Sequence, residues 1–218
     1  DLFFTVDYYN IQVDDRISQS DKIELSQADK DTLEAAGVPN VQNLAQVSFF
    51  TNDFDTTTQG IDAVANYSTD LLGGSSTFSL AYNWNDTEVT KSTDITGEFK
   101  VSRLENDLPN HRATLSWAQQ WESFSAFTRV NYYGEYQGVH VDYDATAKTA
   151  DAAVTIDAEV TYFLTEELSF SVGATNLFDQ EAEKLDFFDS TGIPNNNWGG
   201  KYYETSPYGI NGGFYYVK

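Results

Sequence analysis

The sequence contains no cysteine and no methionine, and only four of its 218 residues are proline. The absence of cysteine excludes disulfide bridges, thiolate metal sites and cysteine nucleophiles. Basic residues are scarce too, because 12 Lys and Arg stand against 34 Asp and Glu and give a formal net charge of −22. Phosphate binding needs clustered Lys and Arg, so nucleic acid is not expected as a partner.

Long apolar runs are also missing. No stretch approaches the roughly 20 apolar residues of a membrane-spanning helix, and the mean hydropathy is −0.45. A transmembrane β-barrel has an equally low mean, because its apolar lipid-facing residues alternate with polar lumen residues. Aromatic residues make up 15% of the chain, with 14 Tyr and 15 Phe. The period of the apolar pattern is therefore more informative than its mean.

Eight stretches alternate between apolar and polar residues with a period of two, which predicts β-strands. The predicted strands cover residues 2–17, 50–68, 77–86, 110–118, 123–136, 151–164, 167–175 and 208–218. In one of them, the apolar Leu115 and Trp117 flank the polar Ser116. The parity of the first strand changes after Tyr9, which predicts a β-bulge near Tyr9 and Asn10.

The connections between these strands alternate in length. The longer ones cover residues 18–48, 87–109, 137–150 and 176–207, and the short ones cover 69–76, 119–122 and 165–166. This alternation predicts an all-β fold of about eight antiparallel transmembrane β-barrel strands, with long extracellular loops and short periplasmic turns. Tyr and Trp residues lie mostly toward strand ends, where amphipathic rings sit at membrane interfaces. In the alternative interpretation these rings fill a soluble β core, which leaves the loop asymmetry unexplained.

The first long connection has the signature of a short helix. Ser26 is a suitable N-cap with Asp29 at position N3, and Gly37 and Pro39 are suitable residues to end the helix. A folded insert in an outer loop suits a ligand gate, and it suits a solvated surface helix equally well.

Several runs resemble segments of one family, the TonB-dependent outer-membrane receptors. The most specific is Gly-Ala-Thr-Asn-Leu-Phe-Asp at 173–179, which is similar to a motif near the C-terminus of these receptors. The runs at 206–209 and 213–217 resemble the entry into their last strand, and those at 6–11, 58–62 and 108–112 resemble their later strands. The resemblance covers essentially the whole chain.

The resemblance implies a barrel of about 22 strands with a plugged lumen. Residues 1–218 are then the C-terminal part of that barrel, and the plug domain and the TonB-contacting segment lie N-terminal to it. The chain opens within a strand-like run and is expected to be a mature or internal fragment. It stops at Lys218, whereas the family's final strand normally ends in an aromatic residue, so a few C-terminal residues are expected to be missing.

The implied function is active uptake of a scarce nutrient across the outer membrane of a Gram-negative cell. The implied substrate classes are siderophores, cobalamin, oligosaccharides and peptides. The implied partners are outer-membrane lipid, the protein's own plug domain, a small-molecule substrate and, through the missing N-terminal part, the TonB–ExbB–ExbD complex. Two alternatives stay open: a complete eight-stranded outer-membrane barrel with a structural or adhesive role, and a soluble β-rich binding module.

Candidate functional residues fall into three groups. The expected ligand contacts in the last long loop are Trp198, Tyr202, Tyr203 and Glu204. The charged residues expected to face the lumen are Asp7, Asp62, Arg112, Arg129, Asp157 and Glu159, which we expect mainly to keep the lumen wet and to anchor a plug. The residues expected to face lipid include Ile61, Ala65, Leu80, Leu115, Val130 and Val160. Within the second group, Arg129 is predicted to contact Asp157 or Glu159.

Enzyme chemistry is not expected, and neither is a cofactor or a metal. The sequence has no Gly-rich phosphate motif and no plausible Ser/His/Asp triad. Its two histidines are His111 and His140. His140 lies close to Asp142 and Asp144, a set that suits a metal ion, but a solvated acidic loop is the favoured interpretation.

Overall fold

The computed structural model describes residues 1–93, 97–140, 143–184, 202–203 and 205–218. Its strands are β1 (Leu2–Gln19), β2 (Ile23–Glu24), β3 (Gln46–Val47), β4 (Phe50–Leu71), β5 (Gly74–Lys91), β6 (His111–Gln120), β7 (Phe124–Tyr133), β8 (Tyr136–His140), β9 (Tyr143–Ala150), β10 (Ala153–Phe163), β11 (Ser169–Thr175) and β12 (Phe214–Val217). Its helices are α1 (Gln27–Ala35), the 3-10 helix η1 (Val41–Asn43) and α2 (Gly97–Asn106). Among the described residues, no helix is long and apolar enough to cross a membrane.

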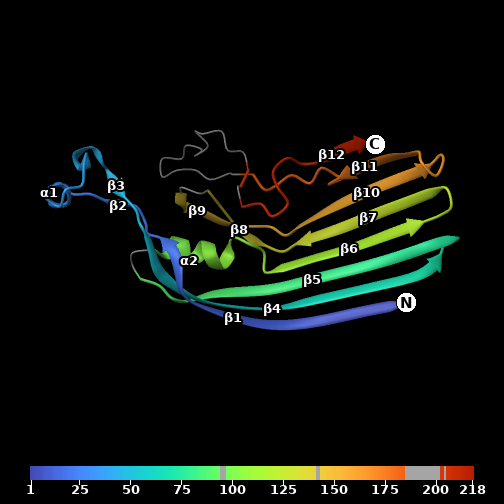
Figure 1. Cartoon of the computed structure of the whole chain (residues 1–218), viewed down its shortest axis with the longest axis horizontal. Helices are drawn as coiled ribbons and strands as arrows, with labels where there is room; N and C mark the ends of the chain where they lie inside the picture. Colours follow the sequence, from blue (N-terminus) through green and yellow to red (C-terminus); the bar gives the residue numbers. More distant parts are fainter. Residues whose placement is uncertain (94–96, 141–142, 185–201, 204) are drawn as a thin grey trace. The chain divides into compact units, whose positions relative to one another are not determined.

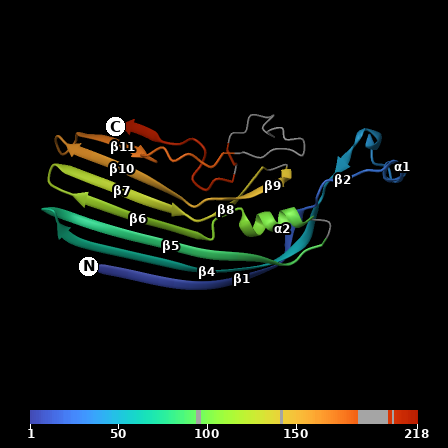
Figure 2. The ribbon, with the colours of Figure 1, turned by 180° about the vertical axis from the view of Figure 1, so that it is seen from behind.

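Eight strands form one sheet in the order β1-β4-β5-β6-β7-β10-β11-β12 (Figure 1). Figure 2 shows the same order from behind. The strand pairs from β5 to β12 are antiparallel throughout. These eight strands correspond to the eight predicted ones, so the all-β antiparallel expectation is confirmed. Two small sheets, β2-β3 and β8-β9, lie in the longer connections.

The chain divides into two compact units. Unit 1 comprises Asp1–Asn10, Gln59–Asp86 and Asn106–Lys218, and unit 2 comprises Ile11–Thr58 and Thr87–Glu105. In unit 1 the three short connections, β4–β5, β6–β7 and β10–β11, lie at one end of the strands. The longer connections β7–β10 and β11–β12 leave from the opposite end, as the alternation of lengths predicts.

The strand bounds differ most from the predicted ones at β4 and β5, at β7, which ends at Tyr133 and not at 136, and at β12. β4 and β5 are longer than predicted and leave only Leu72 and Gly73 between them, with φ of 54° and 76°. Two successive positive φ angles are typical of a type I′ hairpin, whose twist matches that of the strands. β1 runs from Leu2 to Gln19, and the β-bulge near Tyr9 and Asn10 stays a prediction; its left-handed residue is Asp15, with a φ of 53°. The third difference is β12, which is much shorter than the predicted strand at 208–218.

The register gives the unit 1 sheet an apolar face. Leu80 pairs with Leu115, Leu115 with Val130, and Val130 with Ile156, which shares its side of β10 with Val160. Leu115 is 50% exposed and Val160 is 54% exposed. A soluble monomer rarely exposes so continuous an apolar surface.

Unit 2 carries the predicted helix, α1. The backbone N–H of Asp29 donates to Ser26 Oγ at 3.2 Å, and Asp29 Oδ2 accepts from the backbone N–H of Ser26 at 2.9 Å. This is the expected capping box, and Gly37, with a φ of 87°, lies just past the end of the helix. The hydrogen bonds from Ser26 hold the pKa of the Asp29 carboxyl below its usual value.

The second helix of unit 2, α2, was not predicted from the sequence. Lys100 Nζ donates to the carbonyl oxygens of Gln19 and Ser20, each at 2.5 Å, and lies 3.5 Å from Asp21 Oδ1. The Arg103 guanidinium lies 5.8 Å from the centre of the Phe99 ring. The position of α2 therefore depends on contacts with the segment that follows β1, which the local sequence does not reveal.

Candidate functional site

The six charged residues expected to face the lumen lie on the polar face of the sheet, opposite the apolar face. They are Asp7, Asp62, Arg112, Arg129, Asp157 and Glu159. Asn83 Nδ2 donates to Asp62 Oδ1 at 2.6 Å, and Asn83 pairs in register with Arg112. Ile61 and Ala65 alternate with Asp62 along β4, so their side chains lie on the other side of that strand.

Asp7 is assigned to the polar face through its neighbour Tyr9. The two residues lie on the same side of β1, and the Tyr9 ring occupies the space into which a side chain at Gly60 would project. Gly60 and Asp62 share one side of β4. The structure thus brings all six residues to one face, and exposure of that face to a barrel lumen stays a prediction.

Arg129 and Asp157 form an ion pair on this polar face. They are direct partners in the register of β7 and β10. Arg129 Nε donates to Asp157 Oδ2 at 2.8 Å, and Arg129 Nη2 lies 2.7 Å from the same oxygen. Asn131 Nδ2 also donates to this oxygen, at 3.3 Å. The predicted contact between Arg129 and Asp157 is confirmed.

The second carboxylate oxygen of Asp157 holds the start of the last long loop. Asp157 Oδ1 accepts from the backbone N–H of Asn176 at 2.8 Å, and the N–H of Leu177 donates to Ile156 O at 2.6 Å. Asn176 has a φ of 52°, which asparagine tolerates better than most residues. Its side chain accepts from the N–H of Gln180 and donates to the carbonyl of Gln180, each at 2.9 Å.

The Asn-Leu-Phe-Asp run at 176–179 is a closed turn tied to the last strand. The N–H of Asp179 donates to Asn176 O at 2.9 Å, and Asp179 Oδ1 accepts from the N–H of Gly213 at 2.7 Å. Tyr215 Oη donates to Leu177 O at 3.0 Å. Because Asp179 binds the backbone at Gly213, β12 begins only at 214, which explains why the predicted last strand was too long.

Glu159 anchors the other end of β12. Tyr216 Oη donates to Glu159 Oε2 at 2.8 Å, and Lys218 Nζ donates to the same oxygen at 3.1 Å. Tyr216 pairs in register with Gly173, and its ring fills the space above that glycine. Lys218 Nζ also lies 4.5 Å from the centre of the Tyr216 ring. Glu159 on the polar face and Asp179 in the turn at 176–179 therefore both hold the last strand in place.

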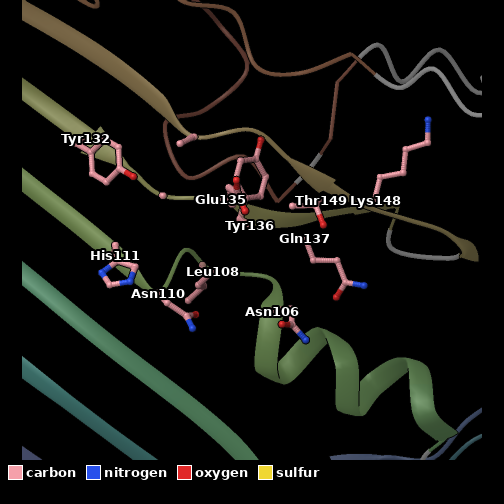
Figure 3. A pocket seen from close by; sticks show the side chains of 12 residues that line it. Asn106, Leu108, Asn110, His111, Tyr132, Glu135, Tyr136, Gln137, Lys148 and Thr149 are labelled. Atoms are coloured by element: carbon pink, nitrogen blue, oxygen red, sulfur yellow. The ribbon is translucent and has the colours of Figure 1, made fainter.

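Unit 1 also contains a cavity of about 560 Å³, here called the β6–β7 cavity (Figure 3). It lies where the start of β6 and the end of β7 give way to longer connections. Its lining includes Asn106, Asn110, His111, Tyr132, Gln137 and Lys148. A volume of this size lies within the range of small-molecule sites.

Two aromatic side chains of the apolar face form the sheet side of this cavity. His111 lies two positions from Ala113, and Ala113 pairs in register with Tyr132. The Nδ1 atom of His111 lies 2.8 Å from Tyr82 Oη, and the two rings are stacked with centres 6.2 Å apart. Tyr132 is 39% exposed. Rings of this kind suit the level at which a membrane meets water.

Three described residues of the last long loop, Tyr203, Thr205 and Tyr208, pack against β7 and β8. Tyr203 is fully buried, and its ring fills the space above Gly138. The rings of Tyr133 and Tyr208 lie 5.5 Å apart. Burial raises the pKa of Tyr136 to about 12 and raises the pKa of Tyr208 as well. Both phenols therefore stay neutral to a higher pH than an exposed tyrosine does.

This packing bears on the four expected ligand contacts. Trp198 and Glu204 lie outside the described residues. Tyr202 is partly exposed and forms an isolated bridge with Lys184. Tyr203, being buried, reaches a ligand only after its segment moves. Ligand contact by these four residues stays a prediction.

The β6–β7 cavity was not predicted from the sequence. Asn106 and Gln137 line it from α2 and β8, which are far apart in the sequence, and neither residue belongs to a recognisable motif. The side chains of His140, Asp142 and Asp144, considered above as a metal set, lie outside the described part of the chain. Within that part, no group of three or more His, Asp or Glu is placed to hold a metal ion.

The arrangement of strands, faces and terminal turn can be compared with known proteins. The family described as "TonB dependent receptor-like, beta-barrel" matches residues 1–177. The chain belongs to this family. A search of curated protein sequences gave no match.

Three solved structures of low sequence identity share the fold. The outer membrane transporter YddB from Escherichia coli is 12% identical, with a TM-score of 0.61 over 99% of this chain and 30% of that one. The copper transporter OprC is 16% identical, with a TM-score of 0.55 over 99% and 28%. The FpvAI–pyocin S2 complex contains a chain that is 14% identical, with a TM-score of 0.54 over 99% and 24%. The chain thus spans less than a third of each of these proteins.

Proposed function

We propose that residues 1–218 are the C-terminal part of the barrel of a TonB-dependent outer-membrane transporter, which imports a scarce nutrient into a Gram-negative cell. The main support for this proposal is the sheet. It has one apolar face and one polar face, and the longer connections of unit 1 leave from one end of it. An apolar outer band with a polar interior is the arrangement that a transmembrane barrel requires. The family membership supports the same role.

The two edges of the sheet support a larger barrel. β1 and β12 are the terminal strands of the hydrogen-bonded order. Open strand edges are not tolerated in lipid, so further strands of the same protein are needed to close the barrel. This argues against a complete eight-stranded barrel, and the exposed apolar face argues against a soluble module. The proposed partners are therefore outer-membrane lipid, the protein's own plug domain and, through its N-terminal part, the TonB–ExbB–ExbD complex.

The proposed activity is transport, because the charged groups of the polar face serve structural ion pairs, Arg129 with Asp157 and Lys218 with Glu159. The charged polar face keeps the lumen hydrated and gives a plug domain polar contacts. In the last long loop, Trp198, Tyr202, Tyr203 and Glu204 remain the proposed ligand contacts. Trp198 is the best residue of the four to substitute, because its indole ring offers the largest stacking surface.

Uptake by cells that carry the full-length protein tests this function. A Gram-negative host that lacks its own receptors is supplied with a ferric siderophore, cobalamin, an oligosaccharide or a peptide as the limiting nutrient. We expect uptake of one class, dependent on TonB and weakened by Trp198→Ala. Recovery of the protein outside the outer-membrane fraction, or uptake that persists in a TonB-deleted host, would contradict the proposal.

A further inference from the structure

We propose that the β6–β7 cavity binds a sugar ring. The cavity is described by residues of unit 1 alone, and the proposal rests on the chemistry of its lining and not on transport. It therefore stands or falls separately from the proposed function.

The polar part of the lining matches the hydroxyl groups of a saccharide. Asn106 and Gln137 contribute amides, and Thr149 contributes a hydroxyl. Figure 3 shows the Gln137 amide extending toward Asn106. A sugar hydroxyl both donates and accepts hydrogen bonds, and an amide presents two donors beside a carbonyl acceptor. Groups of this type can satisfy neighbouring hydroxyls of one ring without carrying charge.

The aromatic part of the lining matches the apolar face of the same ring. Tyr132 is 39% exposed and forms part of the cavity wall. His111 lies beside it and has its Nδ1 engaged by Tyr82 Oη, 2.8 Å away. When the Tyr82 hydroxyl donates this bond, the proton of the neutral imidazole is on Nε2, which makes His111 a hydrogen-bond donor. The C–H face of a pyranose ring can lie against Tyr132, and its hydroxyls can donate to or accept from His111 Nε2, whichever tautomer His111 adopts.

The charges of the lining do not favour an ionic ligand. Lys148 and Glu135 are its two ionised residues, and they have opposite signs. Tight binding of phosphate or of an anionic chelate calls for several converging cations, and the chain as a whole carries a charge of −22. A neutral, hydroxyl-rich molecule encounters neither repulsion nor a buried unpaired charge in this cavity.

The sugar ring has two possible sources with the same chemistry. It belongs either to a free oligosaccharide or to the headgroup of a glycolipid in the surrounding membrane. The second source is suggested by Tyr132 and His111, whose side chains project from the apolar face of the sheet. The experiment below separates the two.

The test uses the purified full-length protein in detergent and a glycan panel of neutral hexose, N-acetylhexosamine and deoxyhexose oligosaccharides. Hits are measured by calorimetry. We expect Tyr132→Ala to weaken binding by about tenfold or more, and Gln137→Leu to weaken it as well. Tyr132→Phe keeps the ring and should retain binding. Tyr162→Ala is the matched control, because Tyr162 is also on the apolar face and is 42% exposed, but lies at the other end of the sheet.

A second arm compares intact lipopolysaccharide with its lipid-free core oligosaccharide. Binding of both intact lipopolysaccharide and its core supports the proposal and identifies a glycolipid headgroup as the source. Binding of panel sugars alone supports the proposal and identifies a free oligosaccharide. The proposal is overturned if no sugar binds, or if Tyr132→Ala binds as the unchanged protein does. In each of these cases, TonB-dependent uptake measured separately shows whether the transport function still holds.

Discussion

Arg129 and Asp157 are direct register partners across β7 and β10, yet they differ in their environments. The Arg129 side chain is 45% exposed, whereas the Asp157 side chain is 9% exposed. One oxygen of Asp157 binds the guanidinium, and the other binds the backbone N–H of Asn176 at 2.8 Å. Asp157 thus joins a cross-strand ion pair to the turn that begins the last long loop, and Arg129 takes part only in the first of these contacts.

This asymmetry predicts different effects of two alanine substitutions. Asp157→Ala removes the acceptor of the Asn176 N–H and should speed hydrogen exchange across 176–180. Arg129→Ala leaves that acceptor in place and should leave exchange there nearly unchanged. Because solvent screens the half-exposed Arg129, we expect a coupling of only about 1 kcal/mol in a double-mutant cycle. Equal acceleration by both substitutions would mean that the turn depends on the ion pair and not on the carboxylate alone.

The two faces of the sheet predict a labelling pattern, which the absence of native cysteine makes easy to read. Cysteine at Leu80, Leu115, Val130 or Val160 of the full-length protein in membranes should react with a lipid-soluble maleimide and not with a water-soluble one. Ser116→Cys is the matched control, since Ser116 pairs with Arg129 on the polar face. Efficient reaction of Leu115→Cys with the water-soluble reagent would contradict the barrel assignment.

The buried phenol of Tyr136 predicts a dependence on alkaline pH. Its pKa of about 12 lies above the ordinary value of 10.0. A raised folded-state pKa means that the neutral phenol contributes stability below pH 10, and that this contribution is lost as the pH rises through 12. An ultraviolet titration should show one tyrosine that ionises at a higher pH than the others, and Tyr136→Phe should remove this late transition. If the late transition survives this substitution, it belongs to another tyrosine, with Tyr208 the next candidate.

The capping box of α1 predicts a local loss of helix stability. Ser26→Ala removes the acceptor for the Asp29 N–H and should reduce the stability of residues 27–35 by about 1 kcal/mol. Hydrogen exchange of the α1 amides measures this directly. Ser26→Thr keeps the hydroxyl and should restore most of the protection, so protection that is unchanged in Ser26→Ala would show that the cap contributes little.

The open edges at β1 and β12 predict the behaviour of the isolated chain. Without the strands that would pair with these edges, residues 1–218 should aggregate or fail to insert into bilayers. Heat-modifiable mobility on gels and protease resistance are the measurements, with the full-length protein as the control. A protease-resistant, heat-modifiable monomer formed by residues 1–218 alone would instead favour a complete eight-stranded barrel.

The sequence by itself determined the eight sheet strands and the two faces of the sheet. A side-chain period of two is fixed by the geometry of a strand, so the polar position of Arg129 and the apolar position of Leu115 follow from local order. The Arg129–Asp157 contact was also predictable, because short turns fix the depth of antiparallel neighbours. The capping box of Ser26 and Asp29 is equally local, since both partners lie within one helical turn.

Only the tertiary structure decided where the loops pack. α2 depends on Lys100 reaching the carbonyls of Gln19 and Ser20, and β12 is shortened because Asp179 binds the backbone at Gly213. The β6–β7 cavity likewise joins residues of α2, β6, β7, β8 and β9. Such contacts join segments far apart in the chain, and their stability comes from pairing and burial in three dimensions, which no local period encodes.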